Sequence, residues 1–414
     1  MSLRIGLVSY EFATHGRGGG IGTYIRNVAQ MLSAKGMDVE VFTCAVRATT
    51  ESSEGYRVNG IPSKRDTFAL DIVPCFSKRH IHRPFDVIEA REYGADLWEI
   101  NQRFPNVPYV VKLATARYQV GRMDEAYLTS LRKARFILGG LKRGMIPKPF
   151  WGQYNAADDQ EYLITRGANE VTSPTEALLQ KTREDWELDP DKCVVIPHVF
   201  TPSAKLLAAK EGRQTKTVSF VGRLEVRKGV LELADAIPMV LKEMPQAKFK
   251  MVGQSLPHPG TQRDLHQELV ERIGKSAMSR VEFTGSVPYE EIPSIYASSD
   301  IAVFPSYWEA FGFVCLEAMS SACGVVASGS GGMAEIIEDG RTGLLINPKK
   351  PREIANAIIS LLNAPEKRIA MGKAAREHVL TTYSADRIAP LQIASYERAI
   401  ENAKNRNAQG ATVR

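Results

Sequence analysis

The chain has 414 residues, of which 44% are hydrophobic and 24% are charged. These are ordinary globular values that exclude a disordered, fibrous or collagen-like chain, and the length suits two domains. The 53 Lys and Arg exceed the 47 Asp and Glu by six. This surplus is too mild to demand a nucleic-acid partner, although it suits anionic small molecules or an anionic surface.

The five cysteines form no CxxC pair, and most of them fall inside apolar runs. This pattern indicates reduced thiols in a cytoplasmic protein rather than a disulfide framework or a zinc site. No apolar stretch approaches the roughly 18 residues of a membrane-spanning helix, and the first residues lack the features of a secretory signal. We therefore expect a soluble or peripheral protein.

The first half of the chain alternates short apolar runs with helical periodicity. Strands are predicted at residues 3–9, 38–43, 86–89, 109–113, 170–173 and 193–197. After the first strand, apolar residues from Ile21 to Leu32 recur at helical spacing, and Gly36 is a natural C-cap. This alternation predicts a parallel sheet covered by helices.

The same alternation restarts in the second half, after a small, polar and charged segment at residues 201–215. Strands are predicted at residues 217–221, 247–252, 281–284, 301–304, 324–327 and 343–346, with a helical segment between each pair. We place a domain boundary near residue 205. The sequence predicts two doubly wound α/β domains, whose ligand sites lie at the carboxyl ends of the strands.

A glycine-rich loop, residues 16–22 (GRGGGIG), separates the first strand from the first helix. Its glycines would let the backbone approach an anion at the helix N-terminus, although a merely flexible turn is the alternative. The spacing is not GxGxxG, and the second strand ends without an acid for a ribose. A nicotinamide enzyme is therefore disfavoured.

The first strand of the second domain runs directly into residues 222–229 (GRLEVRKG). Arg223 and Lys228 would project from the carboxyl end of that strand. Two cations there could neutralise a diphosphate and stabilise it as a leaving group without a metal ion. A solvated surface loop with two basic residues is the alternative.

Two glutamates, Glu309 and Glu317, lie eight residues apart after the strand that Pro305 ends. A helix is predicted to start near Gly312, which puts Glu309 in the loop and Glu317 in the helix. The amides at residues 311–314 would point at an anion, beside two carboxylates able to accept hydrogen bonds from hydroxyls. This fits a phosphate ligand rich in hydroxyls, whereas two solvated surface acids are the alternative.

Other patterns argue against further enzyme classes. The loop at residues 329–335 (GSGGMAE) is neither GxSxG nor a P-loop, which disfavours a hydrolase or an NTPase. Asp189 and Asp191 form a DxD that precedes its strand, so we interpret it as a turn and not as a metal site. The histidines include no HExxH, and we predict no metal site.

Residues 126–157 contain six basic side chains and no acid. Aromatic and aliphatic residues are interleaved with the basic ones, which makes the segment a candidate for binding an anionic acceptor or a membrane surface. A solvated basic helix is the alternative. The six basic residues are Arg132, Lys133, Arg135, Lys142, Arg143 and Lys148.

Taken in order, these motifs resemble the retaining nucleotide-sugar glycosyltransferases of the two-domain GT-B fold, the group 1 family that includes bacterial polysaccharide and lipid glycosyltransferases. The resemblance runs from the glycine loop through residues 222–229, 285–320 and 331–346 to the late helix at 396–400. It implies two Rossmann-like domains facing across a cleft, with residues 1–205 binding the acceptor and residues 206–382 binding the donor. Residues 383–414 would form a helix returning to the first domain, followed by a polar tail.

The resemblance also implies roles for individual residues. Arg223 and Lys228, next to Gly222, would grip the donor diphosphate, and Glu317 would hold the ribose hydroxyls. Backbone near Val287 would meet the base. The loop of Gly19 and Gly20 would close over the diphosphate and the acceptor. The transferred sugar would be held by Glu309 with the amides of Phe311, Gly312, Phe313 and Val314.

Two positions depart from the family pattern. Ala114 stands where a His commonly contacts the donor sugar, and Gly324 stands where Pro is usual. The missing His leaves open whether another group makes the contact or whether the protein only binds nucleotide sugars.

The implied function is a retaining, metal-independent transferase without a cofactor. It would move a hexose, by default from UDP-glucose, to a carbohydrate or lipid-linked acceptor in polysaccharide or glycolipid biosynthesis. Peripheral contact with an anionic membrane is a further expectation, and nucleic acid is not an expected partner. A non-catalytic nucleotide-sugar binding subunit and a nucleotide-sugar 2-epimerase are the alternatives.

Overall fold

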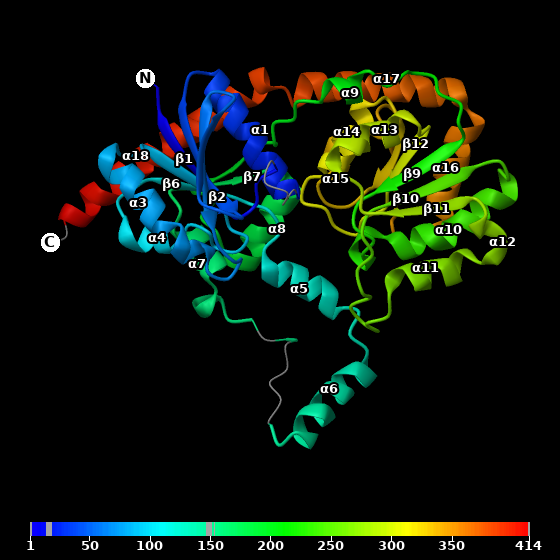
Figure 1. Cartoon of the computed structure of the whole chain (residues 1–414), viewed down its shortest axis with the longest axis horizontal. Coiled ribbons are helices and arrows are strands. Elements are labelled where there is room, and N and C mark those ends of the chain that lie inside the picture. The colour runs from blue at the N-terminus through cyan, green and yellow to red at the C-terminus, as the bar shows by residue number, and fades with distance from the viewer. Residues whose placement is uncertain (1, 14–18, 146–150, 153, 413–414) are drawn as a thin grey trace. The chain divides into compact units, whose positions relative to one another are not determined.

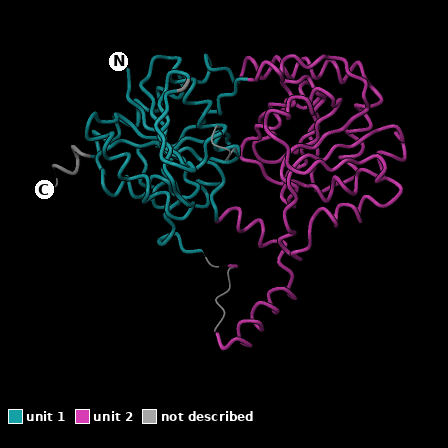
Figure 2. The backbone as a smooth tube through the Cα atoms, viewed as in Figure 1, with its two compact units in different colours: residues 1–117, 154–201, 383–414 teal, residues 118–153, 202–382 magenta. Residues whose placement is uncertain are grey.

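The chain folds into two compact units (Figure 2). A computed structural model describes residues 2–13, 19–145, 151–152 and 154–412. Unit 1 comprises residues 1–117, 154–201 and 383–414, and unit 2 comprises residues 118–153 and 202–382. The segment 118–153, which the sequence analysis assigned to the first domain, thus groups with unit 2.

Unit 1 is built on an eight-stranded sheet in the order β3-β4-β2-β1-β5-β6-β7-β8 (Figure 1). β3 and β4 pair antiparallel, whereas β4 and β2, and the neighbours that follow them in this order, pair parallel. Six strands match the predicted ones, but the β3–β4 hairpin was missed because the polar β3 shows no apolar alternation. The strands are β1 (Arg4–Ser9), β2 (Asp38–Ala45), β3 (Thr49–Ser53), β4 (Tyr56–Pro62), β5 (Val87–Arg91), β6 (Tyr109–Lys112), β7 (Glu170–Ser173) and β8 (Cys193–Val195).

The helices of unit 1 include the one predicted after the glycine loop. Tyr24, Ile25, Val28 and Leu32 of this helix, α1, are buried, and the chain leaves it at Gly36 with a φ of 81°. The helical segments are α1 (Gly20–Ala34), α2 (Phe68–Asp71), α3 (Val73–His82), α4 (Trp98–Arg103), η1 (Ala156–Asp158), α7 (Gln160–Gly167), α8 (Glu176–Trp186), η2 (Pro190–Lys192) and α18 (Ala385–Thr412).

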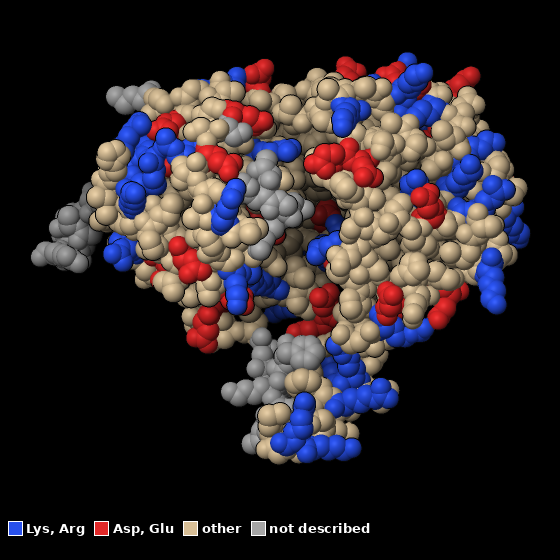
Figure 3. Space-filling view, viewed as in Figure 1, with Lys and Arg blue, Asp and Glu red and all other residues tan. Residues whose placement is uncertain are grey.

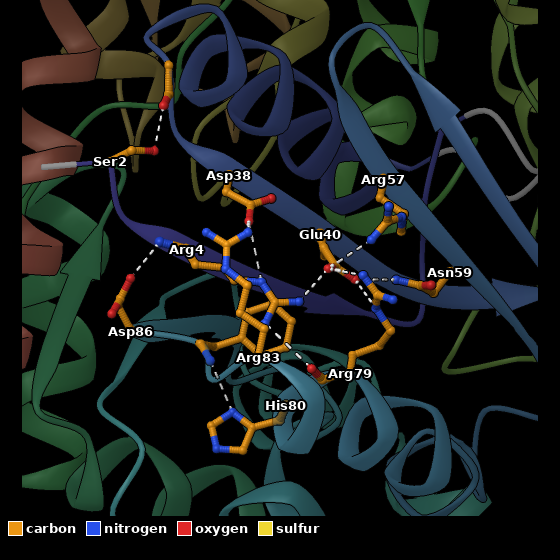
Figure 4. Close-up of polar contacts among 12 residues, drawn as sticks. Ser2, Arg4, Asp38, Glu40, Arg57, Asn59, Arg79, His80, Arg83 and Asp86 are labelled. Atoms are coloured by element: carbon orange, nitrogen blue, oxygen red, sulfur yellow. Dashed lines mark hydrogen bonds and ion pairs between the residues drawn. The ribbon is translucent and has the colours of Figure 1, made fainter.

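A buried ion-pair cluster closes the amino edge of the unit 1 sheet, where β1 and β2 begin (Figure 4). Glu40 accepts hydrogen bonds from Arg4 Nη2 and from Arg79 Nη2, both at 2.6 Å, and from Asn59 Nδ2 at 3.2 Å. Arg57 Nη1 adds a fourth contact at 3.3 Å. A buried carboxylate is tolerated only when its partners are complete, as they are here. The opposite, carboxyl edge is left for ligands.

The last helix returns to unit 1, as the family resemblance implies. Gln392 Nε2 and Tyr396 Oη on α18 donate to Glu89 Oε2 on β5 at 2.8 and 3.0 Å. Farther along, Arg398 Nη2 pairs with Glu170 Oε1 on β7 at 2.7 Å. Glu89 is fully buried. These contacts make α18 part of the core of unit 1.

Unit 2 contains a parallel six-stranded sheet in the order β11-β10-β9-β12-β13-β14. The chain progresses from β9 to one side and from β12 to the other, so the topological switch point lies between these two strands. The six strands match the six predicted in this half. They are β9 (Thr217–Val221), β10 (Lys248–Val252), β11 (Val281–Gly285), β12 (Ile301–Phe304), β13 (Gly324–Ser328) and β14 (Leu344–Ile346).

Helices cover both faces of this second sheet, and the two doubly wound α/β sheets confirm the predicted fold class. No helix among the described residues is long and apolar enough to cross a membrane. The helical segments of unit 2 are α5 (Arg117–Glu125, whose first residue belongs to unit 1), α6 (Ser130–Lys142), α9 (Ala204–Leu207), η3 (Val226–Lys228), α10 (Val230–Glu243), α11 (Leu265–Ile273), α12 (Lys275–Met278), η4 (Tyr289–Glu291), α13 (Ile292–Ala297), α14 (Phe313–Ser320), α15 (Met333–Ile336), α16 (Pro351–Asn363) and α17 (Pro365–Thr382).

Candidate functional site

The candidate site lies at the switch point of the unit 2 sheet. The loop after β9, residues 222–229, carries Arg223 and Lys228, and the loop after β12, residues 305–312, carries Glu309. Because β9 and β12 are hydrogen-bonded neighbours, their carboxyl ends present both loops at one edge. Residues 81 positions apart in the sequence therefore meet there.

Glycines allow these loops to approach one another closely. Gly229 has a φ of 68°, and a Cβ on it would lie 1.9 Å from the carbonyl oxygen of Pro305. Gly253, which follows β10, has a φ of 138°, and its Cβ would lie 2.0 Å from the carbonyl oxygen of Gly222. At both positions a side chain is excluded by the backbone conformation and by the neighbouring backbone. The close approach of the loops thus depends on glycine.

Lys228 Nζ and Glu309 Oε2 form an ion pair between the two loops. Their side chains are 15% and 19% exposed, so the pair is mostly shielded and still reaches the surface. Burial alone would raise the pKa of Glu309, but the charges of Lys228, Arg227 and Arg223 together hold this pKa below its ordinary value. Glu309 is therefore ionised at neutral pH and is matched by surrounding cations.

Arg223 is the exposed cation of the loop. Its side chain is 60% exposed, and its Nη2 lies 3.3 Å from Glu225 Oε1. The same carboxylate oxygen accepts a 2.6 Å hydrogen bond from Arg227 Nη2, and Arg227 Nη1 donates to the carbonyl oxygen of Trp308. Arg227 thus ties the two loops together, whereas Arg223 extends toward solvent, where it can contact a ligand.

The N-terminus of α14 faces the same edge. Gly312 caps the helix with a φ of 113°, and Phe313 and Val314 are its first residues, so the positive end of the helix dipole lies beside Glu309. Glu309 is also held by a third loop, because Gly332 N donates to its carbonyl oxygen at 2.7 Å. The sequence prediction of a loop Glu309 beside a helix start is confirmed.

Glu317 lies one helical turn farther along α14. Glu317 is 4% exposed, and its Oε1 accepts a 3.0 Å hydrogen bond from the hydroxyl of Tyr289. Tyr289 begins η4, two residues after Val287, and is 45% exposed. Glu317 and the segment around Val287 are therefore neighbours, joined by a tyrosine that the sequence analysis did not single out.

The other predicted site residues lie in unit 1. Gly19 is the N-cap of α1 and Gly20 is its first residue, and the carbonyl oxygen of Gly19 accepts from Thr23 N at 3.1 Å. Gly16 to Gly18 lie outside the described residues. Phe311, in contrast, is buried in unit 2 between Glu309 and the cap of α14. All predicted site residues other than Gly19 and Gly20 are thus in unit 2.

Sequence reasoning missed Glu92, which directly follows β5 at the carboxyl edge of the unit 1 sheet. Its two carboxylate oxygens lie 2.6 and 2.8 Å from Ala114 N, and burial raises its pKa to about 7. Ala114, the position at which the resemblance implies a His, is itself buried. An acid placed immediately after a predicted strand is the signal that could have found Glu92.

Gly324 has a local explanation. Its amide donates to the carbonyl oxygen of Asp300 at 3.0 Å, a bond that proline cannot make. A Cβ on Gly324 would lie 2.7 Å from Cγ of the buried Arg368. Arg368 in turn pairs with Asp300 at 3.4 Å. The glycine therefore fits the packing around this buried ion pair.

The DxD segment lies away from any strand's carboxyl end. Asp189 caps η2, with its side chain accepting from Asp191 N at 3.1 Å, and η2 precedes β8. Within the described part of the chain, no group of three or more His, Cys, Asp or Glu side chains is placed to hold a metal ion. Arg223, Arg227 and Lys228, together with the dipole of α14, provide positive charge at the unit 2 site.

The arrangement suits one type of ligand. Two cations and a helix N-terminus stabilise a group with more than one negative charge, such as a diphosphate. Two carboxylates beside them accept hydrogen bonds from hydroxyls. The site can therefore bind a phosphorylated ligand that is also rich in hydroxyl groups.

Comparisons with known proteins agree with this description. Residues 207–378 match the family model described as glycosyl transferases group 1, and residues 19–198 match that of the glycosyl transferase 4-like domain. D-inositol 3-phosphate glycosyltransferase from Corynebacterium aurimucosum is 27% identical over 91% of both chains. The protein of the same name from Corynebacterium diphtheriae is 28% identical, also over 91% of both chains.

Solved structures share the fold. Sucrose-phosphate synthase from Thermosynechococcus elongatus matches with a TM-score of 0.71 and 24% identity, over 97% of this chain and 100% of its own. HepE from Anabaena, in complex with UDP and glucose, matches with a TM-score of 0.65 and 19% identity, over 95% and 98% of the respective chains. At this level of identity the likeness establishes the two-domain architecture.

Proposed function

Because the chain belongs to the group 1 glycosyltransferases, enzymes that transfer a sugar from a nucleotide-sugar donor, we propose that it transfers a hexose with UDP-glucose as the default donor. The proposed acceptor is a carbohydrate or a lipid-linked glycan precursor. The observation that carries the proposal is the Lys228–Glu309 ion pair, which links the two switch-point loops beside the exposed Arg223. A complex of the similar HepE with UDP and glucose supports the choice of base and sugar.

Each residue of the site has a proposed role. Lys228 and Arg223 would bind the donor diphosphate, whose charge replaces that of Glu309 as a partner of the Lys228 ammonium. Glu309 would then be released to accept a hydrogen bond from the sugar, beside the amides at the start of α14. Glu317, through its carboxylate, would bind the ribose hydroxyls, and the backbone at Val287 would meet the base.

The proposed reaction needs no carboxylate nucleophile. The bond from the sugar's anomeric carbon to the diphosphate oxygen breaks while the acceptor oxygen attacks the same face, and the leaving phosphate takes the acceptor's proton. Retention of configuration follows from attack on that face. Negative charge grows on the leaving diphosphate in the transition state, which is where Lys228 and Arg223 would stabilise it.

We also infer a cytoplasmic location. The inference rests on Cys44, Cys75, Cys193, Cys315 and Cys323, which form no disulfide in the structure, a pattern typical of proteins from a reducing compartment. A cytoplasmic enzyme has direct access to nucleotide sugars. Transfer of the sugar to a polysaccharide or glycolipid acceptor would then take place on the cytoplasmic side of the membrane.

The first test is a thermal-shift panel of UDP, GDP, ADP and their hexose conjugates, with and without EDTA. A ligand at about 100 times its Kd adds about 2.7 kcal/mol of stability. We expect UDP and UDP-glucose to shift the melt in both conditions. If only another nucleotide shifted the melt, its base would take the place of uracil in the proposal. If no nucleotide shifted it, the proposed diphosphate site would be contradicted.

Product analysis then separates the transferase from its alternatives. Incubation of the donor with candidate acceptors, including D-inositol 3-phosphate, after which the corynebacterial relatives are named, should yield a glycosylated acceptor and free nucleoside diphosphate. Binding without turnover would indicate a binding subunit. An altered sugar nucleotide formed without any acceptor would indicate an epimerase.

A further inference from the structure

We propose that helix α6 is an anchoring helix that docks on an anionic lipid bilayer and that it is attached to unit 2, the donor-binding unit. We define the α6 arm as residues 124–145. One consequence of this inference rests on the proposed function, namely that the acceptor is a lipid-linked molecule at the bilayer surface. The binding of the arm to lipid stands on the observations below.

Apart from Phe136, which lies among the basic residues, the α6 helix separates apolar from basic side chains. At 100° per residue, Leu131, Ala134, Ile137, Leu138 and Leu141 fall within an arc of about 120°. The basic residues of the helix occupy the remaining arc, and none of its residues is acidic. They are Arg132, Lys133, Arg135 and Lys142, followed by Arg143 at the C-cap.

The apolar stripe is exposed although the helix is well formed. Leu131 is 61% exposed, Leu138 57% and Leu141 56%, which is unusual for leucines in one row. Thr129 caps the helix by accepting from Arg132 N at 3.2 Å, and Gly144 ends it with a φ of 68°. The helix extends away from the sheet of its own unit, and Lys and Arg gather over it (Figures 1 and 3).

The foot of the arm is attached to the donor loops of unit 2. The Tyr127 ring stacks on that of Tyr307, with centroids 6.5 Å apart and an interplanar angle of 18°. Tyr307 N donates to the carbonyl oxygen of Arg227 at 2.9 Å. On the other side, a Cβ on Gly260 would lie 2.2 Å from the carbonyl oxygen of Tyr127, so glycine is needed there.

Electrostatics connects the same foot to the site. Burial is the main cause that raises the pKa of Asp124, at the end of α5, while the charges of Glu225, Arg227 and Arg223 also act on it. The foot of the arm therefore lies in the field of the diphosphate-binding loop. The arm, although encoded in the first half of the chain, therefore belongs to unit 2.

An anionic bilayer is the occupant that the charges favour. A basic face beside an exposed apolar stripe fits a helix lying in the interface, with its cations at the lipid headgroups and its leucines below them. A second copy of the arm is a poorer occupant, because the five cations of one chain would face the five cations of the other. An exposed stripe of this kind suits lipid, and a lipid-linked acceptor would be presented at the same surface.

The test is co-sedimentation of the full chain with vesicles of neutral phosphatidylcholine and with vesicles that contain about 30% phosphatidylglycerol. We expect binding to the anionic vesicles that weakens with salt. The variant R135E/K142E/R143E, which changes three exposed cations of the arm, should bind them more weakly by about a hundredfold or more, since each cation contributes about a factor of five. The variant L138S/L141S should also bind more weakly, because the apolar stripe is shortened.

The matched control is K242E/K349E/K367E, which changes the net charge equally at three exposed lysines of unit 2. It should bind anionic vesicles nearly as the wild type does. Equal losses in both triple variants, or no preference for anionic over neutral vesicles, would overturn the proposal. A dimer in sedimentation velocity that the α6 substitutions dissociate would assign the stripe to a second copy instead.

A nucleotide melt keeps the two proposals apart. The α6 variants change exposed side chains, so their UDP-induced thermal shift should equal that of the wild type. If vesicles bind but no nucleotide does, the proposed function fails and the anchor stands. If nucleotides bind but vesicles do not, the anchor fails alone.

Discussion

At the scale of single residues, Lys228 is the cation with the most direct consequence for catalysis. It is paired with Glu309 and shielded from solvent, so its charge acts in a medium of low effective dielectric. We predict that Lys228→Ala lowers kcat by about 10²–10³-fold, the usual cost of removing one stabiliser of transition-state charge. Initial-rate kinetics with saturating donor would measure the loss.

Lys242→Ala is the control for this prediction, since it removes an exposed lysine from the helix that follows the same loop. It should retain the wild-type rate. Lys228→Arg, which keeps the charge, should recover part of the activity. Full activity in Lys228→Ala would contradict the proposed diphosphate site.

Glu92 predicts a dependence of stability on pH. Burial raises its pKa from the ordinary 4.5 to about 7, so between these pH values the folded protein holds a proton that the unfolded chain has released. The contribution of the protonated Glu92 carboxyl to the free energy of unfolding is therefore complete below pH 4.5 and is lost as the pH rises through 7. Relative to the wild type, we expect the free energy of unfolding of Glu92→Gln to rise by up to about 3 kcal/mol between pH 5 and pH 8.

Urea unfolding at several pH values would measure this gain. Glu243→Gln, at an exposed carboxylate, serves as the control and should follow the wild type at every pH. A constant difference between Glu92→Gln and the wild type would mean that the carboxyl does not titrate in this range. The backbone contact to Ala114 N can be kept by the amide oxygen of the Gln.

At the scale of elements, the fit between the loops after β9 and β12 depends on Gly229. Its φ of 68° and the 1.9 Å approach of a Cβ to the carbonyl oxygen of Pro305 combine strain with a backbone clash. We predict that Gly229→Ala weakens donor binding and lowers the free energy of unfolding by more than about 1 kcal/mol. Titration of the variant with donor and urea unfolding would test both effects.

Gly340→Ala separates the two causes. Gly340 has a similar φ of 76°, but a Cβ on it would meet nothing within 4 Å. It should therefore show only the conformational cost and normal donor binding. If Gly229→Ala and Gly340→Ala had the same effects, the close approach of Gly229 to Pro305 would not be the cause of the fit between the two loops.

At the scale of the whole molecule, α18 links the last residues of the chain to the core of unit 1. Tyr396→Phe would remove the 3.0 Å hydrogen bond to the buried Glu89. We predict a loss of about 1–3 kcal/mol, the cost of leaving a buried hydrogen-bonding group without its partner, and faster amide exchange in α18. Hydrogen exchange with mass spectrometry would localise the effect to unit 1.

The donor-induced stabilisation of unit 2 should stay unchanged in this variant, because the affected contacts lie within unit 1. Tyr162→Phe is the control, since the hydroxyl of Tyr162 contacts the exposed Arg166. It should cost little, as surface hydrogen bonds compete with water. Equal exchange in both variants would show that Glu89 does not hold α18.

Much of the fold follows from local sequence. Twelve strands were predicted near their observed positions, because buried parallel strands are short apolar runs that turn residues and helices separate. Arg223, Lys228 and Glu309 were placed correctly after strands for the same reason. The hairpin of β3 and β4 was missed, since β3 is polar and β4 contains Asn59 and Gly60, residues typical of turns.

By itself, then, the sequence determined the two α/β halves and the identity of the residues at the carboxyl ends of strands, while the family resemblance implied the return of the last helix. Only the tertiary structure decided that β9 and β12 are neighbours, which brings Lys228 to Glu309, that burial shifts the pKa of Glu92, and that the α6 arm belongs to unit 2. The physical reason is range. Periodicity and turn chemistry act over a few residues, whereas strand order, ion pairing and desolvation depend on contacts between segments far apart in the chain.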